Sequence, residues 1–314
     1  MKIKDYVKSF DKDNSGKLNN KKNWLFCYLM IGYLVIVWAF FFIINNFESF
    51  YLSFIKYDYY GNASWYGFYN FKDAFDMVFN SESSLISIGF LNSIKMFVIQ
   101  QSMLPITLIF CYLMWRGIPG FRALRILIML PNIISGFIMT MVSKQFINGP
   151  LINIFQALGL NISAPLFDAH YSFPLIIFYS IWTGFGGSCL FYTNAMKEID
   201  DSLVESYRVD GVSGMFSEIW HICLPNIWGT LSTFIIGVCC GIFLASGPLL
   251  EFYMYNAPSY VYTSSYFFTL KVYTATDYSM YPVLSAFGWM ITLVTFPFVK
   301  FVRFLIDKYG PSED

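Results

Sequence analysis

The side chains able to form specific polar contacts at a surface are concentrated in one segment, residues 197–225, which reads KEIDDSLVESYRVDGVSGMFSEIWHICLP. The segment holds six carboxylates against two strong cations, Lys197 and Arg208. The six are Glu198, Asp200, Asp201, Glu205, Asp210 and Glu218. A surface of one charge sign attracts partners of the other sign. The segment is therefore predicted to bind a basic partner, the alternative being an acidic loop that is only solvated.

No catalytic set of residues is visible in the sequence. The two histidines, His170 and His221, are accompanied by no H-E-x-x-H, no G-x-S-x-G and no Walker A loop. The one Gly-Lys pair, at residues 16–17, is followed by Leu18. The six cysteines lie in or beside apolar runs without a C-x-x-C pattern, which favours structural thiols over metal ligands or disulfides. We expect no catalytic site and no cofactor, and any ATP must be bound by another chain.

Residues 11–22, DKDNSGKLNNKK, match the front of a calcium-binding loop. Asp11, Asp13 and Gly16 fall at the positions of two ligands and of the sharp turn. The twelfth position needs a bidentate Glu and is Lys22 here, which replaces two oxygen ligands with a positive charge. We expect a solvated basic tail and no metal.

The acidic segment has the periodicity of two short helices. One face of the first would carry Leu203, Val204 and Tyr207. The second would be lined by Met215, Phe216, Ile219 and Ile222. Asp210-Gly211 supplies a break, since glycine readily adopts a positive φ, and Leu224-Pro225 ends the amphipathic stretch.

The elements that must position this segment are predicted to lie in a membrane. Of the 314 residues, 56% are hydrophobic and only 13% are charged, against about 25% charged in soluble domains. A helix needs about 20 apolar residues to cross the hydrocarbon layer. Six uncharged runs qualify, at residues 24–44, 96–115, 126–143, 171–196, 222–250 and 278–299. The sequence therefore predicts an all-α membrane protein with six transmembrane helices.

A seventh uncharged stretch, residues 252–270, is too polar to be a good span. On the six-span topology, 15 of the 20 lysines and arginines fall in the segments predicted to be inside. Cytoplasmic loops retain such residues, so both termini are predicted to be cytoplasmic. The first run is too long for a secretory signal and no cleavage site follows it, so it should remain as a helix.

Within the runs, small residues and prolines indicate helix packing and bends. Gly237, Gly241 and Ala245 recur at four-residue intervals, which favours close approach of another helix. Pro105, Pro131 and Pro248 are tolerated kinks. No ionisable side chain lies inside the six runs, although Lys95 and Glu251 flank them. Coupling of transport to an ion gradient is therefore disfavoured.

With these features in place, the sequence resembles the permease subunits of bacterial binding-protein-dependent ABC importers, of the sugar type with the type I fold. Their cytoplasmic signature runs E-A-A, D-G-A, then Phe, Ile and Leu-Pro. Here it reads Glu205-Ser206-Tyr207, Asp210-Gly211-Val212, Phe216, Ile219 and Leu224-Pro225 at matching spacing. Ser206, Tyr207 and Val212 depart from the usual alanines.

Other segments extend the resemblance over roughly residues 24–304. They are residues 49–54 with 67–71, residues 122–131 with 148–153, and residues 180–186. The resemblance divides the chain into a basic tail (1–23), a first helix with its outer loop (24–84), the permease core (85–304) containing the loop 197–225, and a C-terminal tail (305–314).

The resemblance implies that the loop docks on a cytoplasmic ATPase dimer, which uses the ATP. The docking residues would be Glu205, Asp210, Gly211, Phe216, Leu224 and Pro225, with the Glu205 carboxylate facing a basic residue. It further implies a second permease subunit, expected to be a different chain, an extracytoplasmic solute-binding protein, and a location in the bacterial cell membrane. No nucleic acid partner and no bound cofactor are expected.

The implied cargo is a sugar, an oligosaccharide or a related polyol derivative. Trp182, Trp289 and the tyrosines could stack on sugar faces, or serve as interface anchors and packing. The alternative function is a secondary carrier or channel, which inverted repeats and a midplane charge would favour. An integral-membrane enzyme or a scaffold is a third reading, which a polar catalytic cluster at one membrane face would favour.

Overall fold

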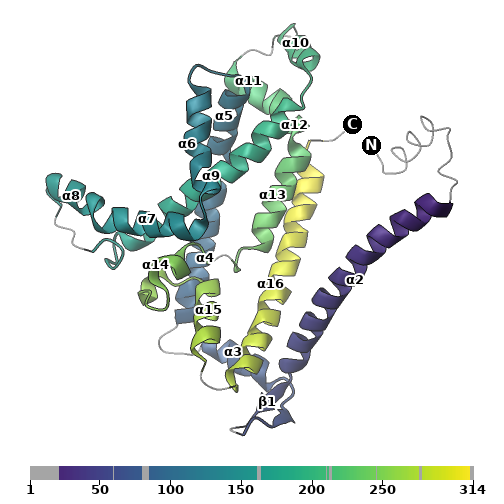
Figure 1. Ribbon diagram of the computed structural model, residues 1–314, viewed down its shortest axis with the longest axis vertical. Helices are drawn as coiled ribbons and strands as arrows, with labels where there is room; N and C mark the ends of the chain where they lie inside the picture. The colour runs from purple at the N-terminus through teal and green to yellow at the C-terminus, as the bar shows by residue number, and fades with distance from the viewer. Residues whose placement is uncertain are drawn as a thin grey trace.

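The computed structural model describes most of the chain beyond its N-terminal tail. The described residues are 21–58, 60–79, 85–160, 164–209, 211, 214–244, 246–275 and 278–311. They form a bundle of long helices with a small hairpin at one end and short helices at the other (Figure 1). The calcium-loop-like residues Asp11, Asp13 and Gly16 lie outside the described residues, as does Asp210.

Long apolar helices dominate the bundle, as predicted. Four candidate spans among the described residues are Tyr28–Leu52, Leu85–Trp115, Ser172–Lys197 and Met280–Tyr309. They correspond to α2 (Lys21–Leu52), α4 (Leu85–Ser102) with α5 (Leu104–Trp115), α9 (Ser172–Lys197) and α16 (Met280–Tyr309). Pro105 lies in the first turn of α5, where its missing N–H leaves no hydrogen bond unmade.

The predicted third span, residues 126–143, is not one straight helix. Helix α6 (Phe121–Ile133) is followed by α7 (Gly136–Asn148) and α8 (Pro150–Ala157), and the two parts meet at an angle of 105°. Ile134, between them, has extended backbone. Ser135 and Gly136 are weak helix formers, so the chain turns there at little cost, which the apolar run alone did not reveal.

The predicted fifth span, residues 222–250, is also broken. The chain runs through α11 (Met215–Glu218), the π-helical turn η1 (Ile219–Cys223) and α12 (Leu224–Asn226), then bends by 78° into α13 (Trp228–Cys240). Gly247, with φ 58°, and Pro248 lead into α14 (Leu249–Tyr253). The described helices thus supply four spans, or up to six if each bent pair counts as one.

A small β-hairpin makes the all-α prediction incomplete. Strands β1 (Ile55–Tyr57) and β2 (Ala63–Trp65) are antiparallel, with Ile55 opposite Trp65, and α3 (Tyr69–Phe79) follows. The Asp58 carboxylate accepts hydrogen bonds from the side chain and backbone of Asn62, which lower the pKa of Asp58. The buried Asn70 amide donates to two carbonyls beside β1 and fixes the hairpin.

The polar stretch 252–270 forms no single helix. It contains the end of α14, the turn η2 (Ser259–Val261) and the start of α15 (Ser264–Thr274). The Asn92 amide of α4 donates to the carbonyls of Tyr260 and Tyr262 at 2.8 and 2.9 Å, which holds this stretch against the bundle. Its rejection as a seventh span therefore agrees with the structure.

The bundle buries two apolar clusters, one toward each end. The first includes Ile176, Leu249 and Tyr266 and lies toward the hairpin. The second, which we call the loop-end core, includes Met196 and Ile222 and lies beneath α10 (Asp201–Val209) and α11. Because side chains from the loop share this core with α5 and α9, loop and bundle are packed as one body at that end.

At Gly237 and Gly241, two of the three residues predicted to admit another helix, no other described helix of this chain comes close, and Ala245 lies outside the described residues. A Cβ at Gly237 would find no atom within 4 Å, and one at Gly241 would contact only its own helix. Two helices do approach each other closely at Gly186 of α9, where a Cβ would lie 2.2 Å from the Ile128 carbonyl oxygen of α6. The four-residue spacing of Gly237 and Gly241 shows that one face of the helix has small side chains. It does not say which helix packs against that face.

Helix α2 leans away from the other helices and approaches them near its C-terminal end (Figure 1). None of its candidate span is buried. Near the end of α2, Phe50 packs edge-on against Trp289 of α16, with ring centroids 5.2 Å apart. Trp289, one of the two tryptophans considered for sugar stacking, thus takes part in packing.

Candidate functional site

The acidic loop, residues 197–225, begins with a capped helix. Helix α9 ends at Lys197 and α10 begins at Asp201. The Asp200 carboxylate accepts the backbone N–H of Ser202 at 2.9 Å, an N-terminal cap, and this hydrogen bond lowers the pKa of Asp200. The carboxylate that caps the helix therefore stays ionised at neutral pH.

Helix α10 has the two faces predicted from its sequence. Val204 is buried, and Leu203 and Tyr207 are half-buried against the loop-end core. Glu205 is exposed on the other side. The packing of α10 therefore presents the Glu205 carboxylate outward from a helix that is anchored from below.

The predicted break after α10 is confirmed at Gly211, whose φ is 90°. A side chain there would strain the backbone, because residues with a Cβ avoid this region. Gly211 thus permits the reversal between α10 and α11.

Phe216 lies on a different face from the one predicted. Ile222 is fully buried and Met215 and Ile219 are partly buried, but Phe216 is 70% exposed. One residue advances about 100° around a helix, so Phe216 points outward when Met215 points inward. Leu224 and Pro225 are half-buried where α12 begins. Glu205 and Phe216 are thus an exposed carboxylate and an exposed aromatic ring on one loop.

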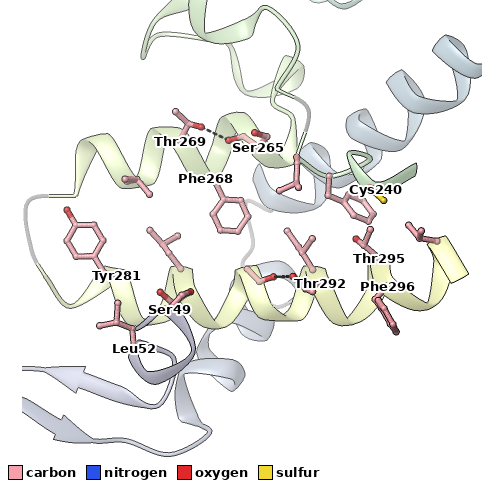
Figure 2. A pocket seen from close by; sticks show the side chains of 18 residues that line it. Ser49, Leu52, Cys240, Ser265, Phe268, Thr269, Tyr281, Thr292, Thr295 and Phe296 are labelled. Atoms are coloured by element: carbon pink, nitrogen blue, oxygen red, sulfur yellow. Dashed lines mark hydrogen bonds between the residues drawn. The ribbon is translucent and has the colours of Figure 1, made fainter. Parts of the chain in front are cut away.

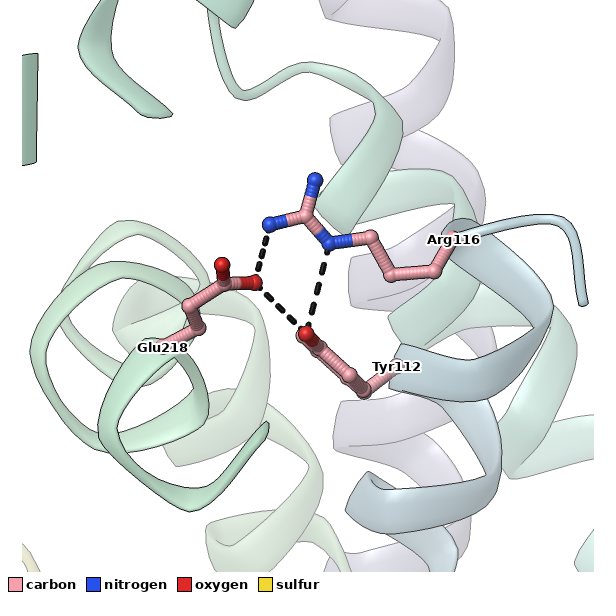
Figure 3. Close-up of polar contacts among 3 residues, drawn as sticks. All are labelled: Tyr112, Arg116 and Glu218. Atoms are coloured by element: carbon pink, nitrogen blue, oxygen red, sulfur yellow. Dashed lines mark hydrogen bonds and ion pairs between the residues drawn. The ribbon is translucent and has the colours of Figure 1, made fainter. Parts of the chain in front are cut away.

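Glu218 does not belong to the acidic surface on which it was first counted. Its residue is 4% exposed, and its carboxylate faces the end of α5 (Figure 3). The Tyr112 hydroxyl donates to Glu218 Oε2 at 2.5 Å, and Arg116 forms an ion pair with the same oxygen. Arg116 Nε also donates to the Tyr112 hydroxyl at 3.3 Å. We call these three residues the clamp.

The clamp connects the acidic loop to the second candidate span. Burial alone would lower the pKa of Arg116, but its hydrogen bonds with Glu218 and Tyr112 raise it overall, so the guanidinium remains charged. Removing one member of a buried ion pair leaves the other charge uncompensated, at a cost of about 3–5 kcal/mol. The clamp therefore ties the end of α11 to the end of α5.

Sequence reasoning missed the clamp because Glu218 is more than 100 residues away from Tyr112 and Arg116 in the chain. From the sequence, Arg116 is only one of the 15 basic residues predicted to lie on the cytoplasmic side. One available signal was the position of Glu218 among Met215, Ile219 and Ile222, since a carboxylate on a buried helix face needs a cation.

A cavity of about 670 Å³ runs along α16, bordered by α13, α15 and the end of α2 (Figure 2). Two of its hydroxyl side chains are bonded to their own helices, Thr269 to the Ser265 carbonyl and Thr292 to the Gly288 carbonyl, each at 2.9 Å, whereas the buried Thr295 hydroxyl has no hydrogen-bond partner. Phe268 and Phe296 also line it. The wall of this α16 cavity is therefore mainly apolar, with hydroxyl groups set into it.

Solved structures with the same fold include a bacterial ABC transporter involved in the import of the acidic polysaccharide alginate. One match covers 93% of this chain and 98% of that chain, with a TM-score of 0.71 and 20% identity. The same transporter in complex with an alginate pentasaccharide-bound periplasmic protein matches over 96% of this chain and 98% of that chain, with a TM-score of 0.72. At 20% identity the likeness establishes the fold.

Sequence relatives agree with that fold. Protein LplB of Bacillus subtilis is 30% identical over 140 residues, which are 43% of this chain and 43% of LplB. The glucose import system permease protein GlcT of Saccharolobus solfataricus is 27% identical over 132 residues, 39% of this chain and 41% of GlcT. The maltose/maltodextrin permease protein MalF of Salmonella typhimurium is 26% identical over 129 residues, 40% of this chain and 25% of MalF.

This chain is similar in sequence to sugar import permeases and in fold to an ABC transporter. The alignments span less than half the length of these curated relatives. No protein-family model matches the sequence. The resemblance to sugar-type permeases expected from the sequence is thus confirmed, and the chain is a multi-helix membrane protein of that fold.

Proposed function

We propose that this chain is the membrane-spanning permease subunit of an ATP-driven importer. It would carry a sugar or oligosaccharide, received from an extracytoplasmic binding protein, into the cytoplasm. The observation that carries the proposal is the acidic loop: an exposed Glu205 on a helix packed into the bundle and, through the clamp, linked to α5. A loop that is packed rigidly into the bundle suits a subunit whose helices are moved by another protein bound to that loop.

The proposed topology has six spans, with each bent helix pair crossing the membrane once and both termini cytoplasmic. The start of α2 and the end of α16 lie toward the end of the bundle that carries α10 (Figure 1). Lys300, Arg303 and Lys308 near the end of α16 suit the positively charged inner face. The hairpin and α3 then face outward, where a binding protein would dock.

Docking on the ATPase would use both exposed side chains of the loop. Glu205 would pair with a basic residue of the ATPase, and Phe216 would fill an apolar pocket beside it. Asp210 and Gly211 would form the turn between the helices, and Leu224 and Pro225 would join the loop to α13. ATP would be bound and hydrolysed by the ATPase dimer, and this chain would hold no cofactor.

A second permease subunit, a different chain, is the proposed neighbour in the membrane. Residues 29–44 of α2 are apolar, and nearly all of their side chains are exposed around the whole helix. An apolar helix in this position contacts lipid or another protein chain. The proposed pair of permeases would enclose the route of the solute.

The proposal is tested by uptake into vesicles. The chain is expressed with the ATPase, second permease and binding protein encoded beside it, and the complex is reconstituted with the labelled ligand of that binding protein. Uptake is expected to require ATP on the side of the acidic loop and to be insensitive to proton and sodium gradients. Gradient-driven uptake without ATP would instead support a secondary carrier.

A further inference from the structure

A second recess, which we call the break groove, lies where the bent pair α6 and α7 changes direction and the chain enters α14. It has a volume of about 460 Å³ and is lined by α9, by the junction of α6 and α7, and by the start of α14. Gly247 brings the chain close to α4 and α9 there, since a Cβ on it would lie 3.0 Å from Met96 and 3.6 Å from the Ser180 hydroxyl. The groove therefore lies among the helices of the bundle, away from the acidic loop.

Most hydroxyl groups that line the groove donate their hydrogen bond to another group of the protein. Ser180 and Thr183 donate to carbonyls one turn earlier on α9, at 2.8 and 2.9 Å. Thr140 donates to a carbonyl of α7, so the Tyr179 hydroxyl, 2.8 Å away, donates to Thr140. Asn132 uses one amide proton on the Thr183 carbonyl. What these oxygens still offer to a solute is lone pairs.

Glu251 adds a carboxylate to this set of acceptors. Its Oε2 is buried and has no hydrogen-bond partner. No Lys, Arg or His is among the described residues that line the groove. A buried carboxylate oxygen without a donor is costly, so it has a strong preference for a ligand that supplies one.

The backbone that carries Glu251 is fixed. Leu249, Phe252 and Tyr253 of the same short helix are buried in the core. The Lys144 ammonium donates to the Phe252 carbonyl at 2.6 Å, and among the described residues it forms no ion pair with Glu251. Glu251 thus extends from a helix that is held in place, and no described cation in the groove pairs with its carboxylate.

We infer that the break groove is a cargo-contact site that selects solutes by charge, with Glu251 as the selecting residue. It takes a polyhydroxylated solute that is neutral or carries a protonated amine, as an amino sugar does, and it disfavours solutes with carboxylates, such as uronic acids. Hydroxyl and ammonium groups can donate to the Glu251 carboxylate and to the hydroxyl oxygens of the groove, whereas a carboxylate would meet a like charge at Glu251 and could be bonded only by the amides of Gln100 and Asn132. The inference rests on the proposed transport function.

The test measures binding of three trisaccharides of equal length to the complete transporter in nanodiscs by titration calorimetry. The probes are a fully deacetylated chitotriose (cationic), maltotriose (neutral) and trigalacturonate (anionic). The wild type is expected to bind the cationic and neutral probes more tightly than the anionic one. Glu251→Gln should reduce the ratio of cationic to anionic affinity by about tenfold or more, and Glu251→Lys should invert the preference.

Two controls separate charge selection from other effects. Glu48→Gln removes an exposed carboxylate on α2, outside the groove, and should leave the affinity ratio unchanged. Thr183→Val removes an acceptor of the groove without changing its charge and should weaken all three probes alike. An unchanged ratio in Glu251→Gln, or no binding of any probe to the wild type, would overturn the inference. If the wild type does not co-purify with the ATPase, or shows no ATP-dependent uptake, that result would instead count against the proposed function.

Discussion

At the scale of single residues, the acidic loop combines an exposed carboxylate, Glu205, with a buried one, Glu218. Glu205 and Gly211 could be placed from local spacing, because exposure on a short helix and a positive φ are local properties. The role of Glu218 depends on Tyr112 and Arg116, which only the tertiary fold brings to it. Phe216 was misplaced because one helical turn is too short for a periodic pattern to fix its face.

The clamp leads to a prediction about stability. Glu218→Ala should destabilise the protein by about 3–5 kcal/mol, because Arg116 would be left partly buried without its counter-ion. Thermal unfolding in detergent, followed by circular dichroism, measures the loss.

A double-mutant cycle supplies the control. Adding Arg116→Ala to Glu218→Ala should cost much less than the sum of the two single changes, since each removes the same interaction. Strict additivity of the two effects would show that the ion pair contributes nothing to the fold.

At the scale of elements, hydropathy located the apolar segments and did not reveal where they turn. The predicted span 171–196 agrees within one residue with α9, Ser172–Lys197, which has no break. The runs 126–143 and 222–250 are equally apolar but turn at Ile134 and Ile227. The length of an apolar run predicts whether the segment transfers favourably into lipid. The direction of the helix depends instead on packing and on weak helix formers such as Ser135 and Gly136.

Close packing of α6 on α9 predicts that Gly186 tolerates no side chain. In Gly186→Ala the new Cβ would meet the Ile128 carbonyl oxygen and the Asn132 amide, at 2.2 and 2.5 Å. The helices must separate, and we expect a loss of about 1–3 kcal/mol of stability, visible as a lower unfolding temperature. Gly237→Ala, whose Cβ enters open space, is the matched control and should be neutral or stabilising. Equal effects of the two changes would contradict this packing.

At the scale of the whole molecule, the sequence predicted the fold class and the family resemblance. It did not predict how the helices are arranged. Two apolar clusters divide the bundle between a loop end and a hairpin end, and α2 leans away from both. Composition could not predict this arrangement, because an apolar helix in a membrane is stable against lipid as well as against protein. The hairpin was missed because three-residue strands leave no readable alternation.

The proposed topology predicts opposite accessibility for the two ends of the bundle. Ser64, on β2, and Ser206, on α10, are both exposed. In intact cells, a membrane-impermeant maleimide should label Ser64→Cys above the wild-type background and should label Ser206→Cys only after the membrane is opened. The reverse pattern would contradict the assignment of the acidic loop to the cytoplasm.

The central claim is that the acidic loop docks on an ATP-binding chain through the surface that carries Glu205. The most direct measurement places a photo-crosslinking amino acid at position 205 in cells that express the complete system, with position 48 as the control. The account predicts a covalent adduct between position 205 and the ATPase, and none from position 48. An adduct of position 205 with lipid alone, or equal yields at the two positions, would contradict it.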